Sequence, residues 1–266
     1  MFDLVPDRSN CLRPVMQPHP PLTAYYGTSD EKRDFVQVLF DQGAPFYDRV
    51  VGWGFLGTGV TYRRMAQRRA GLERGLKLLD AAAGTGLMAE AAIKAGVAPA
   101  DIVCLDPSSG MLAVAREKLQ VEIIQATADA IPLEDASFDF VTMGYALRHV
   151  ADLEATFREY ARVLRPGGRV LILEVTKPEN RCGAWLFRLW FRNLYPALAR
   201  LFTGSEDARR MMRYYWETMD TVVPPATILD ALRAAGFIRV RRRVVGAIFS
   251  EYFAAKSMPR SRAQGT

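Results

Sequence analysis

Residues 76–106 constrain the fold of this chain more than any other stretch. A short apolar run ends at Asp80, small residues with Gly84 and Gly86 follow, and a helix-compatible run comes next. A second apolar run then ends at Asp106, twenty positions after Gly86. An apolar run, a glycine turn and a helix before the next apolar run indicate two parallel strands joined by a helix. The stretch therefore predicts a β-α-β unit.

A unit of this kind suits a cofactor that carries adenosine. Glycines let the backbone approach the ligand closely, the helix N-terminus offers free N–H groups, and an acidic side chain about twenty positions on can accept hydrogen bonds from ribose hydroxyls. The run from Gly84 to Ala89 also fits the loose glycine pattern of nucleotide-dependent dehydrogenases. These residues alone fit a dinucleotide and S-adenosylmethionine equally well.

Three further features resemble class I S-adenosylmethionine-dependent methyltransferases. The first is Asp80, four residues before Gly84. The second is the segment ADAIPL at residues 128–133, which precedes FDFV at 138–141. The third is LRPGG at 164–168, which leads into the apolar run 170–173. More narrowly, residues 145–150, 170–178 and 232–237 look like the ubiquinone/menaquinone biosynthesis C-methyltransferase family. The resemblance covers roughly residues 35–256.

The resemblance implies an α/β, Rossmann-like fold with a seven-stranded, mostly parallel sheet and a helical lid. Residues 238–245 and 247–255, read as two strands joined at Gly246, would form its C-terminal antiparallel hairpin. A dehydrogenase would instead supply a second β-α-β-α-β half. The expected organisation is an extended arm over 1–30, a methyltransferase domain over 31–256 with the lid inserted at about 179–223, and a mobile tail over 257–266.

The resemblance also implies where the cofactor binds. The acidic residue Asp129 would face the adenine amino group, with help from the Ala130 backbone. The cofactor-binding residues expected from the motifs are Asp80, Ala82, Gly84, Thr85, Gly86, Asp106, Pro107, Met111, Asp129, Ala130 and Tyr145.

The polar residues expected nearest the chemistry follow the fourth strand. Arg148 and His149 stand at its carboxyl end, which borders the ligand crevice in an open α/β sheet. A neutral imidazole can act as a base near neutral pH, whereas an arginine stays protonated. We therefore expect His149 to be the base, Arg148 its electrostatic partner and Tyr47 an orienting group. The quinone family more commonly has asparagine where this chain has His149.

Composition limits the partners and the compartment. The net charge of +6 and the pI of about 9.3 favour anionic partners. No nucleic-acid-binding module is visible, so nucleic acid is not expected, and an anionic membrane surface is the better candidate. The three cysteines Cys11, Cys104 and Cys182 are read as reduced thiols of a cytoplasmic protein. With only His19 and His149 besides, no metal site is expected.

The predicted function is methyl transfer from S-adenosylmethionine to a lipophilic small molecule, foremost C-methylation of a polyprenyl benzoquinol or naphthoquinol. O- or N-methylation of another lipophilic metabolite or of a phospholipid head group stays open. A nicotinamide-dependent oxidoreductase is disfavoured, and a scaffold without catalysis conflicts with the intact glycines. The sequence leaves open whether the chain forms a homodimer.

Overall fold

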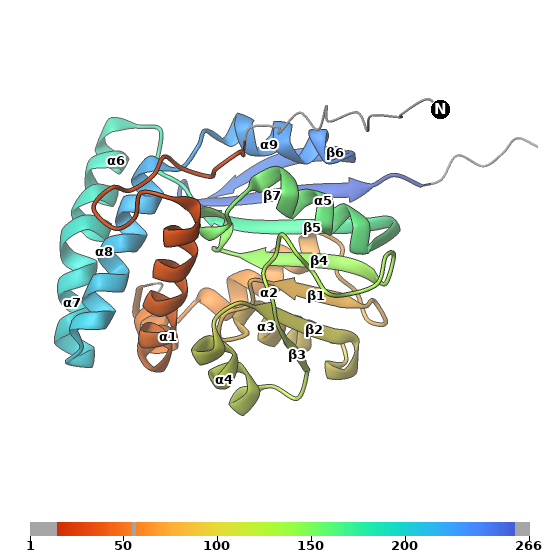
Figure 1. Ribbon diagram of the computed structural model, residues 1–266, viewed down its shortest axis with the longest axis horizontal. Coiled ribbons are helices and arrows are strands. Elements are labelled where there is room, and N and C mark those ends of the chain that lie inside the picture. Colours follow the sequence, from red (N-terminus) through yellow and green to blue (C-terminus); the bar gives the residue numbers. More distant parts are fainter. Residues whose placement is uncertain (1–14, 55–56, 259–266) are drawn as a thin grey trace, which may run out of the picture.

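The computed structural model describes residues 15–54 and 57–258, in which helices flank both faces of one seven-stranded sheet (Figure 1). The strand order is β3-β2-β1-β4-β5-β7-β6. The strands are β1 Leu78–Ala81, β2 Ile102–Asp106, β3 Glu122–Gln125, β4 Phe138–Gly144, β5 Leu164–Val175, β6 Phe237–Val245 and β7 Phe249–Lys256. β1 to β5 are parallel, and β7 is antiparallel to β5 and β6. The predicted sheet with its C-terminal hairpin is confirmed.

Two layers of helices bury the sheet. The helices are α1 Ser29–Gly54, α2 Gly59–Arg69, α3 Leu87–Ala95, α4 Ser109–Lys118, α5 Leu153–Val163, α6 Arg181–Arg188, α7 Tyr195–Thr203, α8 Glu206–Thr221 and α9 Pro225–Ala234, with the short turns η1 Pro99–Asp101, η2 Leu147–His149 and the π-helical η3 Leu189–Leu194. Leu78 and Leu79 of β1 are both fully buried but belong to different core clusters, because successive side chains of a strand point to opposite faces. Leu78 shares its cluster with residues of α2 and α3, and Leu79 with residues of α5 and α9.

The chain between β5 and α9 adds a third group of helices. α8 packs against both α7 and α1, and Figure 1 shows α6 and α7 as the outermost layer beside them. Asn180 caps α6 by accepting a hydrogen bond from the Gly183 N–H, and Ser205 caps α8 in the same way from Ala208. None of the helices in the described ranges is both long and apolar enough to cross a bilayer.

The first helix is longer than the sequence indicates. A glycine-rich loop is expected from residue 51, but α1 continues through Pro45 to Gly54. Proline in a helix interior costs about 3 kcal/mol, so the helix needs support from tertiary contacts. Ala44 and Val50 are buried on either side of Pro45, and α1 packs against α4 and α8. Packing against these helices outweighs the local preference.

The chain ends are only partly described. Residues 15–28 contain no helix or strand, yet His19 and Tyr26 within them are 1% and 4% exposed, so this part of the arm packs on the domain. The mobile tail predicted for 257–266 lies outside the described residues beyond Met258. The lid role of residues 179–223 stays a prediction.

Candidate active site

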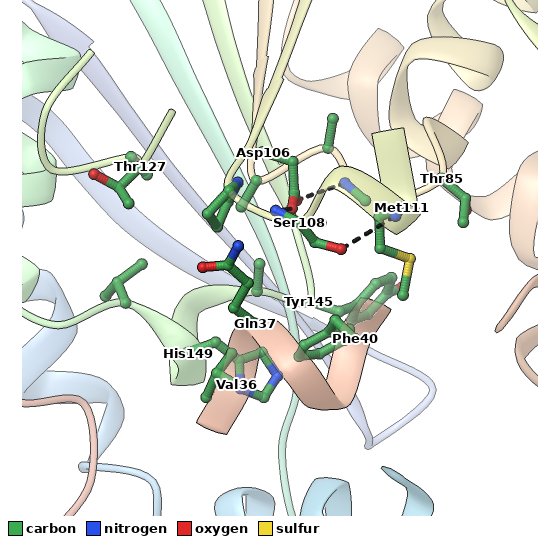
Figure 2. Close-up of a pocket in the computed structure, with 18 of the residues that line it drawn as sticks. Val36, Gln37, Phe40, Thr85, Asp106, Ser108, Met111, Thr127, Tyr145 and His149 are labelled. Atoms are coloured by element: carbon green, nitrogen blue, oxygen red, sulfur yellow. Dashed lines mark hydrogen bonds between the residues drawn. The ribbon is translucent and has the colours of Figure 1, made fainter. Parts of the chain in front are cut away.

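A solvent-open cavity of about 1140 Å³ lies where the loops after β1, β2 and β4 meet the inner side of α1 (Figure 2). Carboxyl ends of parallel strands are where open α/β sheets bind ligands. Arg63 of α2, Tyr215 of α8 and the loop after β3, with Thr127 and Asp129, also line it. The cavity therefore combines the sheet edge with helices that lie far apart in the sequence.

The loop after β1 has the conformation that its small residues suggest. Ala82, Gly84 and Gly86 have φ angles of 55°, 56° and 80°, in the left-handed region where glycine carries no steric cost. A Cβ on Gly84 would meet nothing within 4 Å, whereas one on Gly86 would lie 2.5 Å from Leu119 Cδ1. Gly84 thus serves the backbone turn, and Gly86 also serves the packing of α3 against α4.

Asp106 joins this loop to the end of β2. Its Oδ2 accepts a hydrogen bond from the Gly84 N–H at 2.8 Å, and its Oδ1 accepts one from the Ser108 N–H at 2.9 Å. Burial raises the pKa of Asp106 to about 6, although these two N–H donors act in the opposite direction. A carboxylate held in this way retains lone pairs for a ligand in the cavity.

Asp80 lies behind the loop. It is fully buried, its Oδ2 accepts a hydrogen bond from the Ala89 N–H at 3.1 Å, and its Oδ1 accepts one from the Thr142 hydroxyl at 3.1 Å. Burial raises its pKa to about 7. Asp80 does not line the cavity, and its two hydrogen bonds hold the start of α3 against β4.

Two aspartates of α1 fasten this helix over the cavity. Asp41 Oδ1 accepts hydrogen bonds from the Ser108 hydroxyl at 2.6 Å and from the Gly110 N–H at 2.8 Å. Asp48 Oδ1 accepts one from the Thr85 hydroxyl at 2.5 Å. The two aspartates are seven residues apart, which is two helical turns, so both project from the same side of α1. α1 is thereby tied to both cofactor loops.

His149 lies in an aromatic wall of the cavity. Its ring stacks on Tyr214 with 5.5 Å between ring centroids and meets the rings of Phe40 and Tyr215 edge-on. Neither ring nitrogen has a hydrogen-bond partner among the described residues. Burial, with the charges of Arg148 and Lys32 behind it, holds the pKa of His149 well below its usual range. The imidazole is therefore neutral, and its two buried nitrogens have hydrogen-bonding capacity that no described residue uses.

Arg148 points away from this cavity. Its guanidinium forms a fully buried ion pair with Glu174, and its Nε donates to the Thr218 hydroxyl at 3.2 Å. It also lies over the Tyr215 ring, with Cζ 5.2 Å from the ring centroid. The structure therefore separates Arg148 from the cavity wall on which Tyr47 and His149 both lie.

Most of the expected cofactor residues line one cavity. Those in the wall are Ala82, Gly84, Thr85, Asp106, Pro107, Met111, Asp129 and Tyr145. Asp80, Gly86 and Ala130 do not line it: the first two support the loop, and the Ala130 N–H donates to the Thr127 carbonyl at 3.2 Å.

Sequence reasoning missed the inner side of α1. Lys32, Val36 and Phe40 line the cavity at intervals of four residues, and Gln37 lies beside them (Figure 2). The four-residue spacing is the helical signal that could have found them. Their relation to the cavity was invisible because α1 precedes the β-α-β unit and meets it only through tertiary contacts.

The cavity fits S-adenosylmethionine at its sheet edge. The left-handed glycine loop brings backbone close to a ligand at the N-terminus of α3, and Asp106 is placed to accept ribose hydroxyls. Residues 27–256 match the model of the ubiE/COQ5 methyltransferase family. The chain belongs to this family. It is a methyltransferase with S-adenosylmethionine as its methyl donor, as the motifs predict.

Named relatives of the chain are similar over most of its length. The ubiquinone/menaquinone biosynthesis C-methyltransferase UbiE of Idiomarina loihiensis is 31% identical over 79% of this chain and 86% of its own. The demethylmenaquinone methyltransferase of Thermus thermophilus is 33% identical over 75% of this chain and 91% of its own. Among solved structures, phosphoethanolamine N-methyltransferase 2 of Haemonchus contortus matches with a TM-score of 0.61 and 20% identity over 88% of this chain and 61% of its own, which shows a shared fold.

Cofactor affinity should depend on pH through Asp106. Only the ionised carboxylate offers two negatively charged acceptor oxygens, because protonation turns one of them into a donor, and its pKa is about 6. Affinity for S-adenosylhomocysteine is therefore expected to be constant above about pH 7 and to fall, by about tenfold per pH unit, well below pH 6. Calorimetric titration between pH 5 and 8 measures this.

The Asp106→Asn variant is the control. It should bind more weakly and lose this pH dependence. Dependence that remains reports on the other groups that titrate in this range, Asp80 with a pKa of about 7 and the cavity residue Lys32 with a pKa of about 8. An unchanged pH profile in Asp106→Asn would contradict the role given to Asp106.

Proposed function

We propose that this methyltransferase methylates a ring carbon of a polyprenyl benzoquinol or naphthoquinol. The observation that carries the proposal is the neutral, unpartnered His149 in an aromatic wall, facing the same cavity as the cofactor loops. Apolar rings suit a flat aromatic acceptor, and one imidazole suits its hydroxyl group. The names of the relatives, which include C-methyltransferase and demethylmenaquinone methyltransferase, support the same substrate class.

The sulfonium methyl of S-adenosylmethionine is electrophilic, so the acceptor carbon is what needs activation. A quinol ring carbon becomes more nucleophilic as the neighbouring hydroxyl gives up its proton. In the proposed mechanism one His149 nitrogen accepts this hydroxyl proton. After methyl transfer, the proton on the methylated carbon moves to the phenolate oxygen as the ring becomes aromatic again, and His149 releases its proton to solvent, so one proton is lost per methyl group. The low pKa of His149 makes this residue a weak base. The positive charges of Arg148 and Lys32, which lower the pKa of His149, also stabilise a phenolate beside His149.

Other residues of the chain keep His149 in place. Lys32 Nζ donates to the carbonyls of Arg148 at 3.4 Å and Val150 at 3.0 Å, on both sides of the histidine. Lys32 is 4% exposed and belongs to α1, so it links this helix to the η2 turn. Tyr47 shares a hydrogen bond of 3.1 Å with the Tyr215 hydroxyl and completes the wall. In this proposal Lys32 is a positioning residue and Tyr47 orients the acceptor.

The test is methyl transfer to a short-chain quinol in detergent-free solution, followed by NMR location of the added methyl group. Wild-type protein should yield a ring-methylated product. His149→Phe should lower kcat by about 10²–10⁴-fold because a base is lost, while S-adenosylhomocysteine affinity stays near that of the wild type. His149→Asn, the residue more common in the family at this position, should retain more activity than His149→Phe.

Two outcomes would refute the proposal. One is a methyl group on oxygen or nitrogen. The other is no methylated quinol from a protein that binds S-adenosylhomocysteine.

Because polyprenyl quinols reside in bilayers, we further propose that the chain works in the cytoplasm at the inner surface of a membrane.

A further inference from the structure

We infer that the outer side of α6, η3 and α7 docks on an anionic phospholipid surface. The inference rests on the proposed lipid substrate and adds the face of the protein that meets the bilayer. These three elements form an almost continuous helical segment, residues 181–203, at the outer edge of the molecule (Figure 1). Phe187, Phe191 and Tyr195 bury its inner side. The outer side is available to a partner.

The charges of this segment have a single sign. Residues 181–203 contain four arginines and no aspartate or glutamate. The arginines are Arg181, Arg188, Arg192 and Arg200, all of them exposed. Arg181, Arg188 and Arg192 follow one another at intervals of seven and four residues, close to two turns and one turn, which places these three in one stripe. Arg200 lies eight residues further on, beyond the π-helical η3. Arg200 pairs with Glu206 at 3.2 Å, whereas Arg181, Arg188 and Arg192 form no ion pair with any described residue.

A second stripe on the same outer side is apolar. Leu186, Leu194 and Leu201 follow one another at intervals of eight and seven residues and are 52%, 44% and 74% exposed. Trp185 adds a ring that is 62% exposed. Exposed leucines and an indole beside an arginine stripe are typical of helices that lie in the plane of a membrane interface. Arginine at such a surface pairs with lipid phosphates.

An apolar groove also borders this segment. It has a volume of about 340 Å³, lies between the end of α1 and α7, and is lined chiefly by Val50, Trp53, Trp190, Leu198 and Phe202. Trp53 and Phe202 stack at its edge with 4.3 Å between ring centroids. α1 carries Tyr47 of the catalytic cavity less than two turns before Trp53. The groove therefore offers a seat for an acyl or prenyl chain near the cavity.

Charge favours lipid over a second copy of this chain. In a symmetric dimer through this face each arginine stripe would meet its own copy, because a two-fold interface pairs the same surface with itself. Like charges in such an interface repel each other. An anionic bilayer supplies the opposite charge to the arginines and an apolar phase to the leucines.

Cosedimentation with vesicles tests the inference. The full chain is mixed with phosphatidylcholine vesicles that contain either none or about one third phosphatidylglycerol, and binding is measured at increasing salt. We expect binding to the anionic vesicles that weakens with salt. Replacing three arginines together, Arg181→Gln, Arg188→Gln and Arg192→Gln, should weaken it by about a hundredfold, or about fivefold for each arginine.

Matched variants separate this face from the overall charge. Arg116→Gln, Arg239→Gln and Arg243→Gln together remove the same charge elsewhere and should change binding by less than about threefold, because distant charges are screened. Leu186→Ser with Leu201→Ser should weaken vesicle binding by about tenfold. Ile238→Ser with Val244→Ser on β6, where both side chains are also about half exposed, should not.

The inference would be overturned if the two triple arginine variants weakened vesicle binding equally. It would also be overturned if the Leu186→Ser, Leu201→Ser variant bound vesicles like the wild type but lost dimers in light scattering. Methyl transfer to a short-chain quinol without vesicles is measured on the same variants and should be retained. If the wild-type protein methylates the quinol but does not bind anionic vesicles, the docking face alone is refuted. Vesicle binding without any quinol methylation refutes the proposed substrate alone.

Discussion

Glu174→Ala is expected to lower the free energy of unfolding by about 3–5 kcal/mol. The substitution leaves the Arg148 guanidinium, which is 1% exposed, buried without its carboxylate partner. The Thr218 hydroxyl and the Tyr215 ring remain beside it but carry no compensating charge. Denaturant unfolding followed by circular dichroism measures the difference.

An exposed pair provides the control. Asp230→Ala removes the partner of Arg233 in a pair whose side chains are 53% and 69% exposed, and it should cost less than about 1 kcal/mol. The double variant Arg148→Met with Glu174→Leu should recover most of the lost stability, because an apolar pair of similar volume carries no unpaired charge. A Glu174→Ala protein as stable as Asp230→Ala would show that the buried pair is not needed.

This ion pair changes how Arg148 variants should be interpreted. A fall in activity after an Arg148 substitution is expected from loss of the buried pair alone, before any effect on the chemistry. If the Arg148 charge acts on catalysis through its electric field at His149, the loss of activity would persist in the Arg148→Met, Glu174→Leu variant, which lacks this charge but keeps its fold. Comparing its kcat with that of the wild type therefore separates the two roles.

Gly86→Val is expected to weaken S-adenosylhomocysteine binding by at least about a hundredfold. Gly86 has a φ of 80°, and a β-branched residue there costs about 1–3 kcal/mol before any clash is counted. The added Cβ would also lie 2.5 Å from Leu119 Cδ1, so the Leu119 side chain at the end of α4 must move to make room. The strained turn would shift Gly84, two residues earlier, and with it the hydrogen bond from Gly84 to Asp106. Calorimetric titration measures the affinity.

Gly75→Val separates the backbone cost from the effect on the site. Gly75 has nearly the same φ, 79°, and a Cβ there would meet nothing within 4 Å. This variant should lose stability but keep its affinity for S-adenosylhomocysteine. If both valine variants bound the cofactor like the wild type, the packing role of Gly86 would be wrong.

The cofactor half of the site could be predicted from local sequence. Gly84, Gly86 and Asp106 lie within one β-α-β unit, where chain connectivity and strand direction bring them to the same edge. Spacing could not show which groups face the ligand. Asp80 and Gly86 stand one layer behind the cavity because their hydrogen bonds and packing are made to α3, β4 and α4.

The acceptor half depended on contacts between distant segments. Arg148 and His149 are neighbours in the chain, yet the Arg148 side chain contacts Glu174 of β5 and the His149 ring contacts Phe40 of α1. Whether either side chain reaches the cavity is decided by partners that are 26 and 109 positions away in the sequence.

Sequence alone therefore determined the β-α-β unit and the cofactor loop, since these follow from hydrophobic period, glycine placement and short spacings, and the resemblance to a known family implied the rest of the fold. Only the tertiary structure decided the extension of α1 through Pro45, the burial of Arg148 and the charge and aromatic surroundings of His149. Burial and pairing are properties of the packed chain, and no local pattern encodes them.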